Sequence, residues 1–312
     1  MHRPVMLDEV LAALSPRKGG IYVDGTFGGG GYTKAILDAA DCTVYAIDRD
    51  PDAMTRAKNM ALDYPGRLIP VHDTFGNLKE IATRLDLKKI DGFVLDLGVS
   101  SFQIDEAERG FSFQRNGPLD MRMAQEGQSA ADVVNTASQE ELADIIYTYG
   151  EERAARKIAQ RIVKARAVEK ITTTAQLASI VHTAFPSRGK IDNATRSFQA
   201  LRIFVNDEMG EIDRALAAAE DVLKEGGRLV VVSFHSLEDG RVKEFLRERA
   251  GQMSQPSRHM PEPKSPKTPS FTLGKPEVVK TSETETNDNA RSRSAKLRMA
   301  IRTDAPSWGA SA

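Results

Sequence analysis

Apolar positions in the first hundred residues alternate between short continuous runs and stretches with helical spacing. The continuous runs predict buried strands over residues 21–27, 43–48, 67–75 and 90–98. Between them, apolar residues spaced three and four apart predict helices over residues 32–40, 51–64 and 76–87. Strands that alternate with helices in this way indicate βαβ units, so this part of the chain is expected to be α/β with a parallel sheet.

The alternation stops near residue 102. Residues 102–200 contain no pattern typical of a strand, and helical spacing predicts helices over residues 138–150, 151–170 and 173–185. The βα pattern then returns as a helix over 206–227, a strand over 228–236, a helix over 237–250 and a last strand over 296–303. We therefore expect a core of residues 1–101 and 201–312 that carries an inserted helical domain over 102–200. Residues 251–290, rich in proline, are expected to form a flexible loop.

Composition and charge narrow the class of protein. The 312 residues carry 43 Lys and Arg against 44 Asp and Glu, a net charge of −1, which argues against non-specific coating of nucleic acid but allows a local basic face. No apolar run approaches the roughly 18–20 residues of a membrane span. The first ten residues resemble neither a signal nor a transit peptide, so we expect a cytoplasmic protein without membrane contact. The single Cys42 excludes internal disulfides and cysteine zinc sites, and no metal site is expected.

A glycine-rich turn, DGTFGGGG over residues 24–31, lies between the first predicted strand and helix. Glycines allow close approach of a ligand to backbone amides at a helix N-terminus, and the absence of Gly-Lys-Ser/Thr excludes a P-loop. Asp48 ends the second strand, where an acidic residue binds ribose hydroxyls in dinucleotide folds. Asp24 suits a ligand with an ammonium group better than a pyrophosphate, which favours S-adenosylmethionine over a dinucleotide. Taken singly, Asp24 and Asp48 could instead be ordinary turn or capping carboxylates.

Further polar and aromatic candidates follow the third and fourth strands. Phe75 ends the third predicted strand, where it could stack on an adenine ring or simply pack in the core. Asp96 lies among apolar residues in VLDLG, and because an unpaired buried carboxylate is costly, a partner or ligand is expected. The hydroxyls of Ser100 and Ser101 follow at the carboxyl edge of the sheet, where open α/β folds bind ligands.

Several long segments resemble the bacterial ribosomal RNA small subunit methyltransferase H family, also called the MraW family. Among them are YVDGTFGGGGYTKAIL (22–37), GPLDMRM (117–123) and FHSLED (234–239), and the resemblance spans nearly the whole chain except residues 251–289. It implies a Rossmann-like S-adenosylmethionine-dependent methyltransferase sheet with an inserted all-helical domain that binds the substrate. It also implies methylation of N4 of a specific cytosine, position 1402 in the standard numbering, in the decoding region of 16S rRNA, with an effect on decoding fidelity. The implied partner is 16S rRNA within the small ribosomal subunit.

The same resemblance implies a set of cofactor-binding positions. Carried over residue by residue, these fall on Gly30, Gly31, Tyr32, Asp48, Phe75, Asp96 and Gln103. The family often has His in place of Tyr32, Pro in place of Phe102 and Arg in place of Gly240. The first difference changes little if the backbone makes the contact, and the last removes any role for that side chain.

Methylation of a cytosine amine needs an acceptor for the amine hydrogens, because the N4 lone pair is delocalised into the ring. Asp96 is the first candidate for this catalytic role, Ser100 and Ser101 are the second, and His235 is the third. The alternative for His235 is a hydrogen-bonded structural residue, and the alternative for Asp96 is cofactor binding. The sequence does not decide which group finally takes the proton.

The RNA needs positive charge, and a basic stripe on the predicted helix 151–170 could supply it. Helical spacing places Arg153, Lys157, Arg161 and Lys164 on one face, although a solvated face paired with acids is the alternative. Competing interpretations of the whole chain are a methyltransferase for another cytosine in DNA or organellar rRNA, a non-catalytic ribosome-assembly factor, and a dinucleotide oxidoreductase. The oligomeric state stays open, including a homodimer.

Overall fold

A computed structural model describes residues 4–184, 192–252 and 267–309. The chain divides into two compact units, of which unit 1 contains residues 1–98 and 209–312, and unit 2 contains residues 99–208. Each unit has its own cluster of buried apolar side chains. The second unit is wider at both ends than the expected insertion of 102–200, because Leu201, Phe204 and Val205 at the end of a helix still pack in its core.

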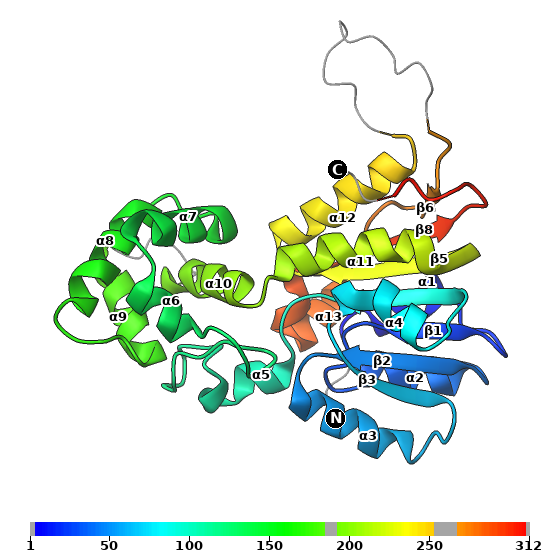
Figure 1. The fold of residues 1–312 in the computed structure, drawn as a ribbon, viewed down its shortest axis with the longest axis horizontal. Helices are drawn as coiled ribbons and strands as arrows, with labels where there is room; N and C mark the ends of the chain where they lie inside the picture. The colour runs from blue at the N-terminus through cyan, green and yellow to red at the C-terminus, as the bar shows by residue number, and fades with distance from the viewer. Residues whose placement is uncertain (1–3, 185–191, 253–266, 310–312) are drawn as a thin grey trace, which may run out of the picture. The chain divides into compact units, whose positions relative to one another are not determined.

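Unit 1 is built on one sheet (Figure 1). The strands are β1 (Ile21–Asp24), β2 (Thr43–Asp48), β3 (Leu68–His72), β4 (Ile90–Asp96), β5 (Leu223–Ser233), β6 (Phe271–Leu273), β7 (Val279–Lys280) and β8 (Lys296–Arg302). Their order is β3-β2-β1-β4-β5-β8-β6, with β7 also paired to β8. The first five strands run parallel, and β8 runs antiparallel to β5, β6 and β7. The predicted parallel α/β sheet is confirmed.

Helices cover both faces of this sheet. They are α1 (Leu7–Leu14), α2 (Gly31–Ala39), α3 (Pro51–Ala61), α4 (Leu78–Arg84), α11 (Glu208–Val222), α12 (Ser236–Arg249) and α13 (Glu283–Asp288). Apolar residues of α1, α2 and α3 form one buried cluster with β1, β2, β4 and β5, and Figure 1 shows α4, α11 and α12 on the side of the sheet that faces the viewer. Local signals start these helices: Asp50 caps α3, and Pro51 stands at its first position.

Unit 2 is helical. Its helices are α5 (Ser101–Asp105), α6 (Ala130–Thr136), α7 (Gln139–Gly150), α8 (Ala155–Arg166), α9 (Thr174–Ala184) and α10 (Ala194–Val205). Helix α10 contacts α6, α7 and α9, and the apolar faces of these helices meet in one core. Ser129 and Ser138 cap α6 and α7 by accepting backbone N–H bonds. Among the described residues of this unit, β pairing is confined to an isolated bridge between Pro118 and Thr173.

Two expectations about the chain are wrong in part. The predicted loop over 251–290 contains β6, β7 and α13, because β8 leaves backbone groups to pair and Phe271 is buried beneath it; residues 253–266 lie outside the described residues. The predicted helix 151–170 is shorter, since α8 begins at Ala155 and ends at Arg166. The pattern also missed helices α1, α5, α6 and α10. None of the helices among the described residues is both long and apolar enough to cross a membrane.

Short 3₁₀ turns complete the description. They are η1 (Phe75–Asn77), η2 (Ala107–Arg109) and η3 (Ala290–Ser294). The first corrects a boundary near the candidate site, since β3 ends at His72 and not at residue 75. The turn begins where Asp73 accepts hydrogen bonds from the Thr74 amide and the Asn77 side chain, which bends the chain away from the sheet.

Candidate functional site

Three carboxylates end three adjacent strands of unit 1. Asp24, the last residue of β1, is level with Ala46 on β2 and Val94 on β4. Asp48 and Asp96 each lie two residues farther along their strands, so β1 stops short and leaves a notch between them. Because side chains alternate with a period of two, the three acids are on the same face of the sheet. The strand order reverses between β1 and β4, the position at which open α/β sheets bind ligands.

Asp24 is the deepest of the three, with 1% of its surface exposed. Its Oδ2 accepts a hydrogen bond of 2.7 Å from the Thr33 hydroxyl, and its Oδ1 accepts one of 3.1 Å from the Thr26 amide. Burial raises its pKa to about 6, although both hydrogen bonds oppose the rise. The structure thus gives Asp24 the turn-forming role, and contact with a donor ammonium stays a prediction.

Asp48 organises the glycine turn from the second strand. Its Oδ2 accepts the Gly28 amide at 2.8 Å, and its Oδ1 accepts the Asp50 amide at 2.9 Å. Burial raises its pKa despite these two bonds. Each carboxylate oxygen retains a further lone pair, so the side chain can accept two ribose hydroxyls and still hold the turn.

The glycines of the turn are required by close packing. Gly30 precedes α2 with a φ of 78°, and a Cβ there would lie 2.6 Å from both Met60 Cε and Phe27 Cζ. A Cβ on Gly31 would lie 2.1 Å from Cγ of Pro4. The Tyr32 side chain is buried, and its hydroxyl donates to the Val5 carbonyl. Any cofactor contact at Tyr32 therefore falls to its backbone.

Asp96 differs from the other two acids because one of its oxygens has no partner. Its backbone amide donates to the Thr26 hydroxyl at 2.7 Å, but its buried Oδ1 has no hydrogen-bond partner among the described residues. Burial, followed by the charges of Asp24 and Glu238, raises the pKa of Asp96 well above its usual value. An orphaned buried carboxyl oxygen is costly, so this atom is suited to accept a hydrogen bond from a ligand.

Phe75 approaches the same notch from η1. Its Cβ lies 3.0 Å from the position that a Cβ on Gly25 would take, directly after β1. The ring is half-buried, as stacking on one face of a ligand requires. The residue that holds this turn was not predicted from the sequence. The Gly76 amide donates a hydrogen bond of 2.8 Å to Glu211 of α11, and no local sequence pattern links residues so far apart.

The serine candidates and Gln103 belong to the start of unit 2. The Ser100 hydroxyl accepts the Gln103 amide at 3.2 Å, while the Gln103 side chain accepts the Ser100 amide at 3.0 Å. In this capping box, which starts α5, each side chain accepts the backbone amide of the other residue. Ser101 is the first residue of α5 and half-buried. The geometry therefore favours a helix-capping role for Ser100.

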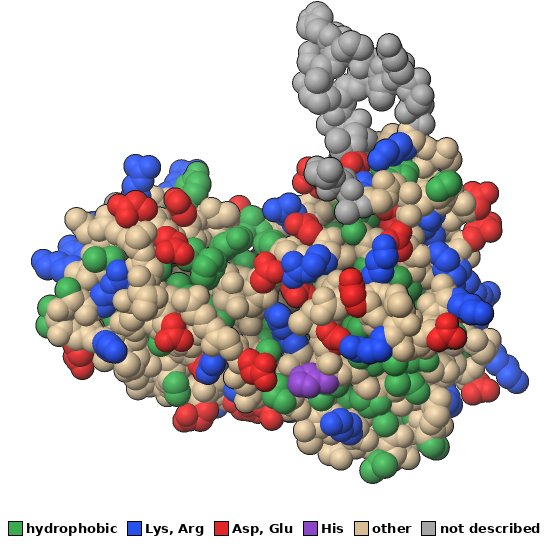
Figure 2. All heavy atoms as spheres, viewed as in Figure 1, with side chains coloured by type: hydrophobic (Ala, Val, Ile, Leu, Met, Phe, Trp, Pro, Cys, Tyr) green, Lys and Arg blue, Asp and Glu red, His purple; other side chains and the backbone are tan. Residues whose placement is uncertain are grey.

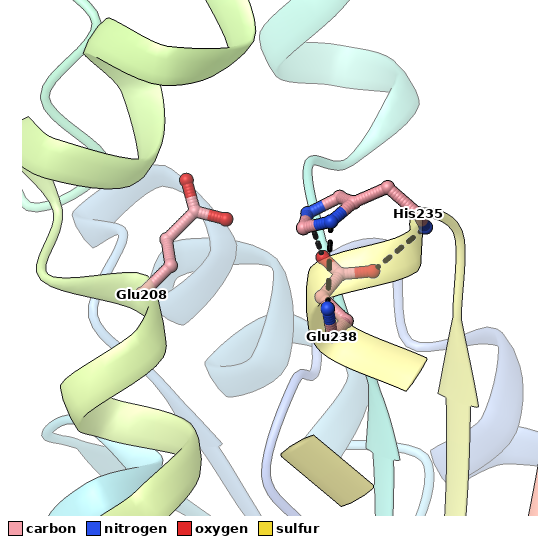
Figure 3. Close-up of side chains that lie close together, drawn as sticks. All are labelled: Glu208, His235 and Glu238. Carbon is pink, nitrogen blue, oxygen red and sulfur yellow. Dashed lines mark hydrogen bonds and ion pairs between the residues drawn. The ribbon is translucent and has the colours of Figure 1, made fainter. Parts of the chain in front are cut away.

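His235 and Glu238 form a second capping box, at the start of α12 (Figure 3). The His235 Nδ1 accepts the Glu238 amide at 3.5 Å, and its Nε2 lies 2.8 Å from Glu238 Oε1. The other Glu238 oxygen accepts the amides of Phe234 and His235. These contacts favour the structural role for His235. Glu238 was missed, although the spacing of a cap residue and a glutamate three positions later could have indicated it.

The basic stripe of unit 2 is only partly as expected. Lys157, Arg161 and Lys164 are exposed on one side of α8, and Figure 2 shows Lys and Arg side chains at the surface where α8 lies. Arg153 is exposed but precedes the helix, because Glu151 ends α7 with a φ of 50° and Glu152 accepts the Ala154 amide. The prediction that four cations share one face of this helix is therefore wrong, and three of them lie on it.

The expectation that the protein has no metal site stays a prediction.

Comparisons with known proteins place the chain in a family. The model of the MraW methylase family matches residues 1–303. A ribosomal RNA small subunit methyltransferase H of Rhodospirillum rubrum is 53% identical over 98% of this chain and 96% of its own length. The protein of the same name in Hyphomonas neptunium is 56% identical over 97% and 89%. A solved rRNA methylase from Streptococcus thermophilus is 12% identical and covers 97% of this chain and 99% of its own, with a TM-score of 0.42. On the family match and the two sequence relatives, the chain belongs to the MraW methylase family and is a methyltransferase.

Proposed function

We propose that this methyltransferase transfers a methyl group to N4 of the cytosine at position 1402 in the decoding region of 16S rRNA, within the small ribosomal subunit, and thereby affects decoding. The names of the sequence relatives support ribosomal RNA of the small subunit as the substrate. The single structural observation that carries the chemistry is the unpartnered Oδ1 of Asp96 at the end of β4. An acceptor aimed at a ligand is what an amine substrate requires.

S-adenosylmethionine is the methyl donor, and when bound it supplies an electrophilic methyl group on a sulfonium. The notch at the ends of β1, β2 and β4 fits this molecule. Asp48 has lone pairs for the ribose, the glycine turn allows close backbone approach, and Phe75 offers a half-buried ring for the adenine. The three acids complement a donor whose ammonium and sulfonium are both positive.

Asp96 is proposed to orient the amine and take its proton. A carboxylate oxygen that accepts an N4 hydrogen concentrates electron density on the nitrogen. As the N–C bond would form, the bond from the methyl carbon to the donor sulfur would break, S-adenosylhomocysteine would leave with that electron pair, and the N4 proton would move to Asp96. The raised pKa of Asp96 makes it a stronger proton acceptor than an exposed aspartate. Asp24 and Glu238 act on this step through their charges, since both raise the pKa of Asp96.

Unit 2 is proposed to bind the RNA. Lys157, Arg161 and Lys164 present three exposed cations on one side of α8, a pattern suited to phosphates. The target cytosine must leave its base stack for its amine to reach the donor, since the methyl transfer needs in-line approach.

The test uses small subunits from cells that lack this methylation and a donor with a deuterated methyl group. Nucleoside mass spectrometry should find labelled N4-methylcytidine, and digestion into oligonucleotides should place it at position 1402. Subunits already methylated serve as the control, and naked 16S rRNA, assembly intermediates and complete subunits tested in parallel identify the substrate form. Label on another nucleoside would overturn the proposal, and donor binding without transfer to any RNA would favour an assembly factor.

A further inference from the structure

The first described residues of the chain lie against the glycine turn. Pro4 contacts Gly31 so closely that a Cβ on that glycine would lie 2.1 Å from the proline ring. The Val5 carbonyl accepts the buried Tyr32 hydroxyl. Met6 is fully buried and caps α1, its carbonyl accepting the Val10 amide at 2.8 Å. We name residues 4–6 the N-terminal strap.

The strap is held by a residue far along the chain. The Met6 amide donates a hydrogen bond of 2.7 Å to Oε1 of Glu285, on α13 of the same unit. Met6 has a φ of 53°, in the left-handed region that side chains other than glycine disfavour. An acceptor for its amide helps to keep the backbone in that conformation, which aims Val5 at Tyr32.

Glu285 is itself fixed to the sheet. Ser282 caps its helix by accepting the Glu285 amide at 3.1 Å. The Ser292 hydroxyl lies 2.8 Å from the Asn289 carbonyl and 3.3 Å from the Glu285 carbonyl, between which it shares its one hydrogen, and Ser292 is fully buried in the turn directly before β8. Hydrogen bonds thus connect the turn before β8 through α13 to the strap, which contacts Gly31 and Tyr32. Burial, followed by the charges of Asp96, Asp24 and Glu285, raises the pKa of Tyr32.

We propose that Glu285 is a positioning residue for the methyl-donor site, which holds the N-terminal strap against Gly31 and Tyr32 and so sets the affinity for the donor. The inference rests on the proposed placement of the donor at the glycine turn. Glu285 acts through the strap and touches neither reactant. Its loss should therefore weaken donor binding and leave the methyl-transfer step intact once donor saturates the site.

The experiment compares Glu285→Ala with Glu285→Gln in the full-length protein. Calorimetry with S-adenosylhomocysteine should give a dissociation constant about five- to tenfold higher for the alanine variant, the net effect typical of one lost hydrogen bond. The glutamine variant keeps an oxygen acceptor and should stay within about twofold of the wild type. KM for the donor should rise in parallel with the dissociation constant, whereas kcat at saturating donor should not change.

The matched control is Glu283→Ala, which removes an exposed carboxylate from the same helix and should leave the dissociation constant unchanged. If Glu285→Ala does not fold, Tyr32→Phe removes the other strap contact and should raise the dissociation constant by itself. In a folded double variant the two effects should be less than additive, because both act through one strap.

Three results would overturn the inference: an unchanged dissociation constant in a folded Glu285→Ala, a glutamine variant as weak as the alanine variant, or a lower kcat with unchanged donor affinity. These results can be distinguished from a failure of the proposed function. If wild-type protein bound no S-adenosylhomocysteine, the donor site itself would be wrong, whereas normal wild-type binding with an unaffected variant would remove only the role of Glu285.

Discussion

The acids at the strand ends of unit 1 and the acids of unit 2 have pKa values shifted in opposite directions. In unit 1, burial raises the pKa values of Asp24, Asp48 and Asp96, which end three adjacent strands. In unit 2, burial also acts to raise the pKa of Asp120, but hydrogen bonds from Arg122 outweigh this effect, and the pKa is lowered. The Ser129 hydroxyl likewise lowers the pKa of the exposed Asp132. In the helical unit, hydrogen bonds from nearby residues thus lower the pKa values of these acids. At the strand ends of the sheet, hydrogen bonds do not outweigh the effect of burial.

The contrast also holds within unit 1. Asp91 is paired with Arg17 and Lys224, and Asp239 with Lys296 and Arg298, and hydrogen bonds from these cations lower both pKa values against the effect of burial. Cations were therefore available to the fold, yet among the described residues only the charge of Arg56 opposes burial at a strand-end acid, Asp48, and it does not outweigh it, a pattern that suits a positively charged ligand.

The largest effect expected from this comparison is at Asp96. Asp96→Asn keeps the shape but removes the charge and the proton acceptor, so single-turnover methylation at saturating donor should fall by at least about 100-fold. Asp63→Asn, at an exposed position of the same unit, is the control. Recovery of the full rate at high donor concentration would assign Asp96 to cofactor binding alone, and Ser100, Ser101 and His235 would then become the catalytic candidates.

Asp48 tests whether a strand-end acid binds ligand as well as holding the turn. Asp48→Ala should weaken donor binding by about 1–3 kcal/mol, because charge-assisted hydrogen bonds to the ribose are lost. Calorimetry on the folded variant measures this directly, with NAD as the competing ligand that should not bind. An unchanged dissociation constant would make Asp48 a purely structural acceptor for Gly28 and Asp50.

The cost of burying Asp24 should appear as a pH dependence of stability. Its folded pKa of about 6 exceeds the ordinary 3.8, so its contribution to stability is full below about pH 4 and is lost as the pH rises through 6. Urea unfolding of the protein without donor should therefore show a loss of about 2 kcal/mol from this group between pH 4.5 and 7.5. Asp24→Asn should lack this component. Identical pH profiles for the two proteins would show that the buried acid is compensated after all.

The smallest effect is expected on the exposed side of unit 2. Replacing Lys157, Arg161 and Lys164 by Gln should weaken RNA binding a few-fold at physiological salt and lower the salt slope by about 2, at about 0.7 per lost contact. Donor affinity should stay the same, since these cations lie outside the donor unit. The control replaces three exposed lysines of unit 1, Lys58, Lys88 and Lys243, by Gln. A wild-type salt slope in the α8 variant would leave the stripe as a solvated face.

Local pattern was enough to find the strands of the parallel sheet, the glycine turn and the acids at the strand ends, although it wrongly assigned residues 223–227 of β5 to the preceding helix. Buried strands need continuous apolar runs, and a turn that packs closely against its neighbours needs glycine. Both features can therefore be recognised from residues that are adjacent in the sequence. The pattern failed at α10, whose buried positions include Ala194, Ser197 and Ala200, because small side chains weaken the apolar stripe of a helix. It also failed for β6 and β7, which form only because β8 offers an edge.

The sequence by itself thus determined the α/β architecture and which acids stand at the carboxyl ends of the strands. Only the tertiary structure decided how each polar atom is used. It pairs Ser100 with Gln103 and His235 with Glu238 as caps, leaves Asp96 Oδ1 without a partner, and brings Glu285 to Met6 across 279 positions. The physical reason is range: strand and helix periodicity record contacts between near neighbours, whereas the partner of a buried polar atom depends on how distant segments pack.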